Sequence, residues 1–253
     1  MRRALLASAC LLGACVGGGR APVRVPVRVV APIPIRTTVE VRVEAWTRLS
    51  TATAGTTVES QAPEDIPVLI RGIFDDGLPS GPVDVVFVVD TTGSMGDDID
   101  AVRRDMREIL DHLRRHNPDY RVGVVAYRDV DDDYLTRTFL ALTRDDARIQ
   151  QAITALTVGG GDDWREHVYA GINTALGQPW RPEASQHIIL MGDAPPHDDY
   201  PNDPRTLDSV TARAQRAPLR VHIHTIGIKC DATCEQVMIE EDAARAAQSR
   251  VLP

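Results

Sequence analysis

Apolar residues along this chain fall into blocks whose lengths and spacing suit short strands and helices. The most apolar block, residues 83–89, is a nearly unbroken β-branched run, as in a strand buried on both faces. It ends at Asp90, and residues 91–94, Thr-Thr-Gly-Ser, suit a tight turn. Acidic residues then open a segment in which apolar side chains recur at helical spacing as far as Leu113. The pattern predicts a central strand, a turn and a long helix.

Later blocks show the same two kinds of pattern, apolar runs typical of strands and apolar residues at helical spacing. Short apolar runs predict strands at residues 120–127, 135–142, 186–191 and 219–226. Helical spacing predicts helices at residues 145–156, 164–176, 207–216 and 235–248. The loop between the first two of these strands is too short for a parallel crossover, so they should be antiparallel. Strands that otherwise alternate with helices predict an α/β fold, with a mostly parallel sheet and helices on both faces.

The start of the chain has the pattern of an exported protein. Two arginines and an apolar run within residues 1–14 have the layout of a signal peptide, and the run is too short to span a bilayer. The run ends in Leu-Gly-Ala-Cys, which resembles the lipobox of bacterial lipoproteins and implies that Cys15 is acylated. Val16 implies, by the same resemblance, an outer-membrane location in the bacterial cell envelope. The alternative is an ordinary signal peptide that ends near a cysteine.

The segment between the signal and the first strong strand is harder to interpret. Residues 15–35 are rich in Gly, Pro, Val and Arg and fit an extended tether. Residues 36–82 show no single pattern throughout, but residues 36–46 alternate apolar and polar side chains, which predicts one or two short strands. Arginines outnumber glutamates from residue 20 to residue 48. They either rest on anionic lipid headgroups or are simply solvated.

Oxygen-bearing side chains cluster after the central strand. Asp90, Thr92 and Ser94 should lie at its carboxyl end, where ligands bind in open α/β sheets. Oxygen ligands suit a hard cation such as Mg²⁺. The alternative is that these residues only cap the following helix.

Four sequence blocks together resemble von Willebrand factor A domains. They are DTTGSM at residues 90–95, YRVGVVAYRD at 120–129, GGGDDWRE at 159–166 and HIILMGDAPPH at 187–197. The resemblance extends to about residue 247 and identifies residues 83–253 as one such domain. It implies a Rossmann-like, doubly wound sheet with one antiparallel edge strand. It also implies a metal-ion-dependent adhesion site, where bound Mg²⁺ or Mn²⁺ accepts a carboxylate from a partner.

The resemblance also assigns the metal ligands. It places Asp90, Thr92 and Ser94 on the first loop of the site, and Asp193 on the third. The second loop departs from the family, because Asp162 stands where many members have threonine. An extra carboxylate would tighten metal binding and weaken the attraction of an acidic ligand.

The role of the second loop stays open. Asp162 either binds the metal, directly or through a water, or only caps the next helix. Glu166 is the alternative ligand or supporting residue.

Other polar groups have less specific patterns. The acidic loop at residues 129–133 either holds a second cation such as Ca²⁺ or is solvated. His197 and the two aspartates after it invite a hydrolase interpretation, although no nucleophile–base pair is visible. Cys230 and Cys234 are within disulfide reach if they lie one turn apart on a helix in an oxidising compartment. Free thiols or a zinc site are the alternatives there.

The family resemblance implies a further strand and helix after the last predicted strand. The chain ends at Pro253, so we expect either that it is truncated, which leaves that edge of the sheet open, or that a partner covers the edge.

The expected function is non-enzymatic binding by a lipid-anchored domain whose cation captures a protein or other ligand with an acidic group. The alternative is a hydrolase that uses the same cation to activate water. The sequence has no phosphate-binding GxxxxGK[ST] loop, and residues 90–93 lack the second aspartate of a DxD phosphatase. A net charge of −8 argues against nucleic acid as a partner.

Overall fold

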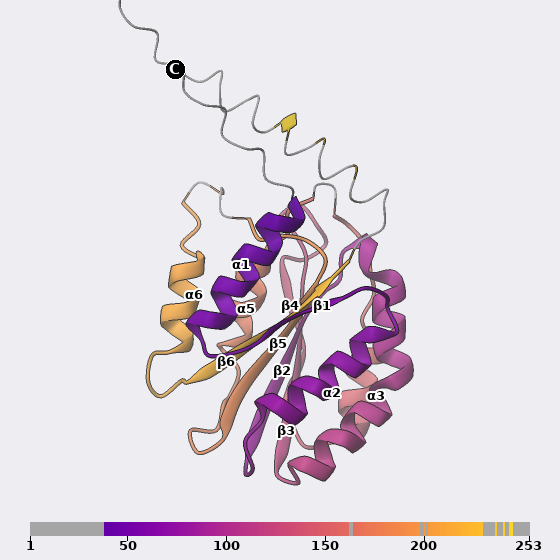
Figure 1. Ribbon diagram of the computed structural model, residues 1–253, viewed down its shortest axis with the longest axis vertical. Coiled ribbons are helices and arrows are strands. Elements are labelled where there is room, and N and C mark those ends of the chain that lie inside the picture. The colour runs from indigo at the N-terminus through magenta and orange to yellow at the C-terminus, as the bar shows by residue number, and fades with distance from the viewer. Residues whose placement is uncertain are drawn as a thin grey trace, which may run out of the picture. The chain divides into compact units, whose positions relative to one another are not determined.

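The computed structural model describes residues 38–161, 164–197, 200, 202–229, 236, 240, 243 and 244. Its described strands form a single sheet in the order β1-β6-β5-β2-β3-β4 (Figure 1). They are β1 (Thr57–Ser60), β2 (Val83–Asp90), β3 (Tyr120–Tyr127), β4 (Thr136–Thr143), β5 (Ser185–Gly192) and β6 (Val221–Ile228). Neighbouring strands are parallel except β3 and β4, which are antiparallel. The predicted α/β fold with a mostly parallel sheet is confirmed.

Helices cover both faces of this sheet (Figure 1). One face packs against α2 (Asp65–Gly77), α3 (Gly96–His116) and α4 (Asp146–Thr154); the other packs against α1 (Thr38–Ala52), α5 (Val168–Ala175) and α6 (Leu207–Ala214). Every side chain of β2 is buried, with Phe87 facing the α3 side and Val88 the α5 side. A strand covered in this way has no solvated face, which is why its sequence is almost continuously apolar. Within the described ranges, no helix has the length and apolar character needed to cross a membrane.

The predicted strands agree with β2 to β6 within two residues at each end. One helix prediction does not hold in full. The helix predicted at residues 164–176 begins only at Val168, because the backbone before it pairs with the loop after β5 through a bridge between Glu166 and Pro196. Most of the helix predicted at residues 235–248 lies outside the described residues, as do the signal peptide, the tether, Cys15, Cys230 and Cys234.

The prediction of strands at residues 36–46 is wrong for its described part, because residues 38–46 belong to α1. The buried residues of this helix recur about once per helical turn. They are Arg42, Trp46 and Leu49. Trp46 and Leu49 pack into the core on the α5–α6 side of the sheet. The short strand of residues 36–82 is instead β1.

The edge of the sheet beside β6 is covered by the chain itself. β1 pairs with β6 in parallel, with Thr57 opposite Thr225 and Ser60 opposite Ile228. The expectation that this edge is open or covered by a partner is therefore wrong along the paired length of β6. β1 is therefore an edge strand of the sheet, and the pairing of β6 with β5, Gly227 opposite Gly192, positions the end of β6 near the loop that follows β5.

Candidate functional site

The centre of the candidate site is the carboxyl end of β2. Asp90, the last residue of β2, is fully buried. Its Oδ1 accepts hydrogen bonds from the Thr92 backbone N–H at 2.9 Å and from the Thr92 hydroxyl at 2.7 Å. Its Oδ2 has no partner of normal hydrogen-bond geometry among the described residues, although the Tyr127 hydroxyl lies beside it. One oxygen of this carboxylate is thus satisfied and the other is not.

Asp193 lies beside Asp90, because β2 and β5 are adjacent parallel strands with Val89 opposite Met191. Asp193 is the first residue after β5 and is buried. The Ser94 hydroxyl is close enough to its side chain to lower its pKa, whereas Asp193 Oδ1 has no hydrogen-bond partner within the described ranges. The structure therefore brings together the four residues predicted on the first and third loops.

The glycine-rich second loop packs directly against the first. The Gly159 N–H donates to the Thr91 carbonyl at 3.1 Å, and the Gly93 N–H donates to the Gly160 carbonyl at 3.2 Å. Gly160 has a φ of +76°, and a Cβ there would lie 1.7 Å from Asp132 Oδ1, so only glycine fits.

The second loop then approaches Thr92. A Cβ on Gly161 would lie 3.1 Å from the Thr92 Cβ, so this residue is in contact with the first loop. Asp162, which follows Gly161, lies outside the described residues. Its predicted role as a ligand stays a prediction.

Glu166 reaches the same region from the extended segment before α5. Its backbone N–H donates to the Pro195 carbonyl at 3.1 Å, and its carbonyl accepts from the His197 N–H at 3.0 Å. The side chain is buried, and Oε2 has no hydrogen-bond partner among the residues that the structure describes. The pairing with the loop after β5 that shortens α5 is thus also what holds this carboxylate in the interior.

Burial raises the pKa of all three carboxylates, and the charge of a neighbouring carboxylate raises it further for Asp90 and Glu166. Burial, followed by the charge of Asp193, raises the pKa of Asp90 to about 7. Burial, followed by the charge of Asp90, raises the pKa of Glu166 to about 11. Burial also raises the pKa of Asp193, although the Ser94 hydrogen bond and the charge of Arg42 oppose it. Carboxylates gathered in this way require protons or a cation.

Arg42 was not predicted to belong to the site, but its side chain hydrogen-bonds to backbone carbonyls beside the site. Its guanidinium donates to the Asp193 carbonyl at 2.9 Å and to the Ile228 carbonyl, and it forms an ion pair with Glu59 at 2.6 Å. Its hydrogen bonds therefore link α1 to the loop after β5. A sequence signal existed, since Arg42 lies one turn before Trp46 on the buried face of α1.

The acidic loop at residues 129–133 lies on the same rim. Asp129 accepts hydrogen bonds from the Tyr200 hydroxyl at 2.8 and 2.7 Å, and His197 Nε2 lies 3.3 Å from its Oδ2. Burial acts to raise the pKa of Asp129, but the bonds from His197 and Tyr200 outweigh it and lower that pKa. Asp132 accepts from the Asp129 N–H at 3.1 Å. These two aspartates are held by protein groups rather than fully solvated.

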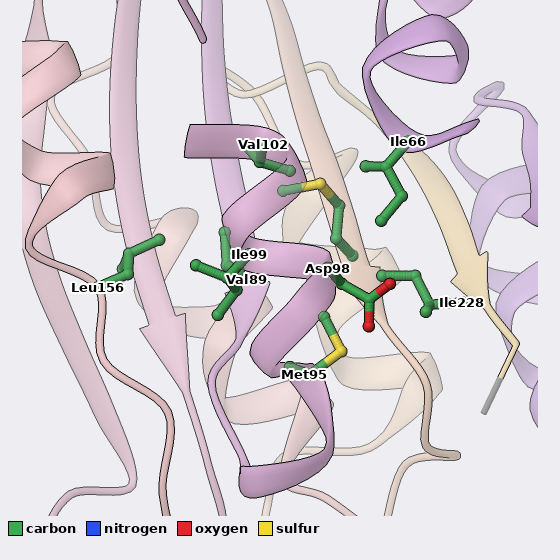
Figure 2. A pocket seen from close by; sticks show the side chains of 9 residues that line it. Ile66, Val89, Met95, Asp98, Ile99, Val102, Leu156 and Ile228 are labelled. Carbon is green, nitrogen blue, oxygen red and sulfur yellow. The ribbon is translucent and has the colours of Figure 1, made fainter. Parts of the chain in front are cut away.

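Asp98 was expected only as a helix-opening residue, but it lines an apolar pocket beside the site. Figure 2 shows its carboxylate directed among apolar side chains, near Met95 and Ile228. Burial, followed by the charges of Asp193 and Asp97, raises the pKa of Asp98 to about 6. The position was readable from the sequence, since Asp98 precedes Val102 by one turn on the apolar face of α3.

The von Willebrand factor A domain model matches residues 84–248. The chain belongs to this family. Residues 38–77, which provide α1, β1 and α2, precede the matched part.

Two curated proteins are similar in sequence to part of this chain. The alpha-protein kinase vwkA of Dictyostelium discoideum is 29% identical over 117 residues, which cover 46% of this chain and 19% of the relative. The putative ariadne-like RING finger protein R811 of Acanthamoeba polyphaga mimivirus is 29% identical over 115 residues, covering 46% of this chain and 11% of the relative. The matched part is thus a small fraction of each relative's length.

Solved structures of von Willebrand factor A domains are also similar. The SpRpn10 VWA domain is 16% identical with a TM-score of 0.41, covering 63% of this chain and 95% of that one. The vWF domain of the type V pili tip protein Mfa5 from Porphyromonas gingivalis is 30% identical with a TM-score of 0.35, covering 45% of this chain and 38% of that one.

Proposed function

We propose that this von Willebrand factor A domain protein binds a protein or other acidic ligand through a divalent cation, Mg²⁺ or Mn²⁺. The proposed ligands of the cation are Asp90, Thr92, Ser94 and Asp193, with Asp162 as a further ligand and Glu166 as supporting or alternative ligand. The observation that carries the proposal is the set of buried carboxylate oxygens without partners among the described residues: Asp90 Oδ2, Asp193 Oδ1 and Glu166 Oε2. A buried charge is costly unless it is paired or binds a metal.

The chemistry of these groups favours a hard cation. The proposed ligands offer carboxylate and hydroxyl oxygens and no sulfur or nitrogen atom, as Mg²⁺ prefers. A bound dication would supply an open coordination position for a carboxylate of the partner. Thr92 keeps Asp90 oriented through its two hydrogen bonds, and the Ser94 hydroxyl lies beside Asp193. The exposed Ser94 lies where a ligand from solvent would arrive.

A metal-assisted hydrolase is the second candidate. The observation in its favour is the buried His197, whose Nε2 lies 3.3 Å from Asp129 Oδ2 on the rim of the site. A histidine paired with a carboxylate can act as a general base. EDTA-sensitive turnover of generic phosphoesters or peptides, lost in His197→Gln, would favour this candidate over binding.

The test of the cation site is a Mg²⁺ titration by isothermal calorimetry on the full chain. Asp90→Asn should lose Mg²⁺ binding while keeping its fold, because the amide replaces a charged ligand without changing volume. Asp97→Asn is the matched control, since Asp97 is an exposed aspartate in the first turn of α3, which follows the same loop. Unchanged Mg²⁺ affinity in Asp90→Asn would refute the site.

The ligand can be sought by a pull-down from envelope extract with and without EDTA. A protein retained by the wild-type chain in Mg²⁺, released by EDTA and absent with Asp90→Asn would be a candidate ligand. If the same protein is retained in the presence of EDTA and by Asp90→Asn, capture does not depend on the cation.

A further inference from the structure

Outside the site described above, α2 packs against α3 (Figure 1). Three side chains that could hold a metal ion meet there. Asp75 comes from α2, and His112 and His116 come from α3. One potential ligand atom from each of the three lies within 4.8 Å of the other two. His112 Nε2 is 2.7 Å and His116 Nε2 is 3.3 Å from Asp75 Oδ1.

The two histidines share one face of α3 because residues four apart on a helix are neighbours. Their rings lie 4.5 Å apart between centroids. This spacing is the one by which two histidines of a single helix bind one zinc ion in metalloproteases. Asp75 supplies the third ligand from the adjacent helix, so the cluster is built by tertiary packing.

The hydrogen bonds around His116 favour metal binding by its Nε2. His116 Nδ1 lies 2.9 Å from the His112 carbonyl oxygen, so Nδ1 carries the proton that it donates there. Nε2 then keeps its lone pair on the side facing Asp75. A backbone carbonyl that fixes the tautomer in this way is a common support for a metal-binding histidine.

The distances suit a tetrahedral ion. Ligand atoms about 2.0–2.1 Å from a tetrahedral zinc lie about 3.3 Å from one another. The Asp75–His116 distance of 3.3 Å already meets this requirement, and the Asp75–His112 distance of 2.7 Å needs only a small side-chain rotation. In the absence of metal, His112 Nε2–H donates to Asp75, while Nδ1 faces Arg115 at 3.5 Å. A metal ion at Nε2 would require the His112 proton to move to Nδ1, which would give up the long 3.5 Å contact with Arg115.

We propose that Asp75, His112 and His116 form a second metal site, for a borderline transition-metal dication of which Zn²⁺ fits best. Two imidazoles and a carboxylate suit zinc better than Mg²⁺. His112 lies roughly 24 Å beyond the first residue of α3, at 1.5 Å per residue, so the site is remote from Asp90. The side chains of Asp75 and His116 are each 47% exposed, so the ion can enter from solvent and keep a position for water.

A Zn²⁺ titration by isothermal calorimetry on the full chain tests this proposal, with excess Mg²⁺ present to occupy the first site. The wild-type chain should bind one more Zn²⁺ than Asp75→Asn, His112→Gln or His116→Gln, or bind it at least about tenfold more tightly. Asp76→Asn is the matched control, because Asp76 is the exposed neighbour of Asp75 on α2 and should leave binding unchanged. Zinc bound by Cys230 and Cys234 would be common to every variant.

Thermal unfolding gives a second readout. Because the ligands come from two helices, Zn²⁺ should raise the Tm of the wild-type chain and of Asp76→Asn, but not that of His112→Gln/His116→Gln. The His112 side chain is 15% and the His116 side chain 47% exposed, so the readout is the change in Tm that zinc causes within each variant. The same Zn²⁺ stoichiometry, affinity and Tm increase in the double variant would overturn the proposal.

Discussion

At the scale of single residues, the candidate site depends on one close approach between strands. Asp90 ends β2, and Gly192 ends the neighbouring β5. A Cβ on Gly192 would lie 3.0 Å from Asp90 Oδ2 and 2.4 Å from the Tyr127 hydroxyl. Tyr127 is itself fully buried and has no room to withdraw. The absence of a side chain at residue 192 therefore allows the carboxylate to sit where it does.

Gly192→Ala should destabilise the protein by about 1–3 kcal/mol, because overpacking a closed interior forces side chains and backbone to shift. The measurement is the free energy of unfolding from urea denaturation. Gly72→Ala is the matched control: Gly72 lies inside α2 with no atom within 4 Å of an added Cβ. It should gain up to about 1 kcal/mol from helix propensity. Equal effects of the two substitutions would contradict the close approach.

A second residue-scale feature is a pair of buried histidines at the other end of the sheet. His187 Nδ1 lies 3.1 Å from His224 Nε2, and His224 Nδ1 lies 2.9 Å from the Thr56 hydroxyl. Burial, followed by the charge of His224, lowers the pKa of His187 to about 2. Burial, followed by the charge of His222, lowers the pKa of His224 to about 4. Both side chains are therefore neutral when the protein is folded at neutral pH.

This pair should make stability depend on pH. In the unfolded chain each histidine takes up a proton near pH 6.5, whereas the folded protein resists protonation until near pH 4 or below. Their contribution to stability is complete above pH 6.5. It should fall as pH drops toward 4, by up to about 1.4 kcal/mol per pH unit for each histidine.

Urea unfolding between pH 7 and pH 4.5 measures that slope. His224→Gln should reduce it relative to the wild type, whatever its effect on stability at pH 7. An identical slope in both proteins would show that His224 is not buried in its neutral form. Comparing the two slopes cancels the contribution of the buried carboxylates, which is present in both.

At the scale of elements, the segment before the family-matched part completes the domain. β1 pairs along β6, α2 packs against α3, and α1 contacts β6. The buried side chains of α2 belong to the same core cluster as Met191 of β5 and Ile226 of β6. Removing these elements would uncover both that cluster and an unpaired strand edge, a condition that favours aggregation.

A chain that begins at residue 81 should therefore be unstable or aggregate, although it contains the whole family-matched part. A chain that begins at Arg36, where the compact unit starts, should fold like the full protein. Size-exclusion chromatography and urea unfolding of the two chains give the comparison. A monomeric short chain with the same urea midpoint would show that α1, β1 and α2 are dispensable.

At the scale of the whole molecule, the proposed function combines a binding domain with an anchor. If Cys15 is acylated, the cation site belongs to a protein held at a membrane rather than one that crosses it. Cys15→Ser should then move the protein from the membrane fraction to the soluble fraction when produced in a bacterium with lipoprotein processing. Cys10→Ser is the control, since Cys10 lies inside the apolar run predicted to be removed. Membrane retention of Cys15→Ser would contradict the lipid anchor.

The sequence by itself determined strands β2 to β6 and the order of strands and helices along the chain. Strands β2, β3 and β5 are buried on both faces, so burial requires apolar side chains at nearly every position and leaves a clear pattern. The DTTGS motif was readable for a related reason, since polar residues that end a buried strand lie at its carboxyl end, whereas the resemblance to the family assigned Asp193. The antiparallel β4 followed from loop length alone.

The tertiary structure alone decided what covers the sheet and what surrounds the carboxylates. The alternation at residues 36–46 favoured a strand, and only the packing of Trp46 against the sheet shows that it is helical, because local propensity yields to burial. Glu166 enters the site through backbone pairing with Pro195, a contact without a sequence pattern. Asp75 and His116 lie on different helices, and no spacing along the chain predicts that their side chains meet. Distances between elements arise from packing, which a one-dimensional pattern does not record.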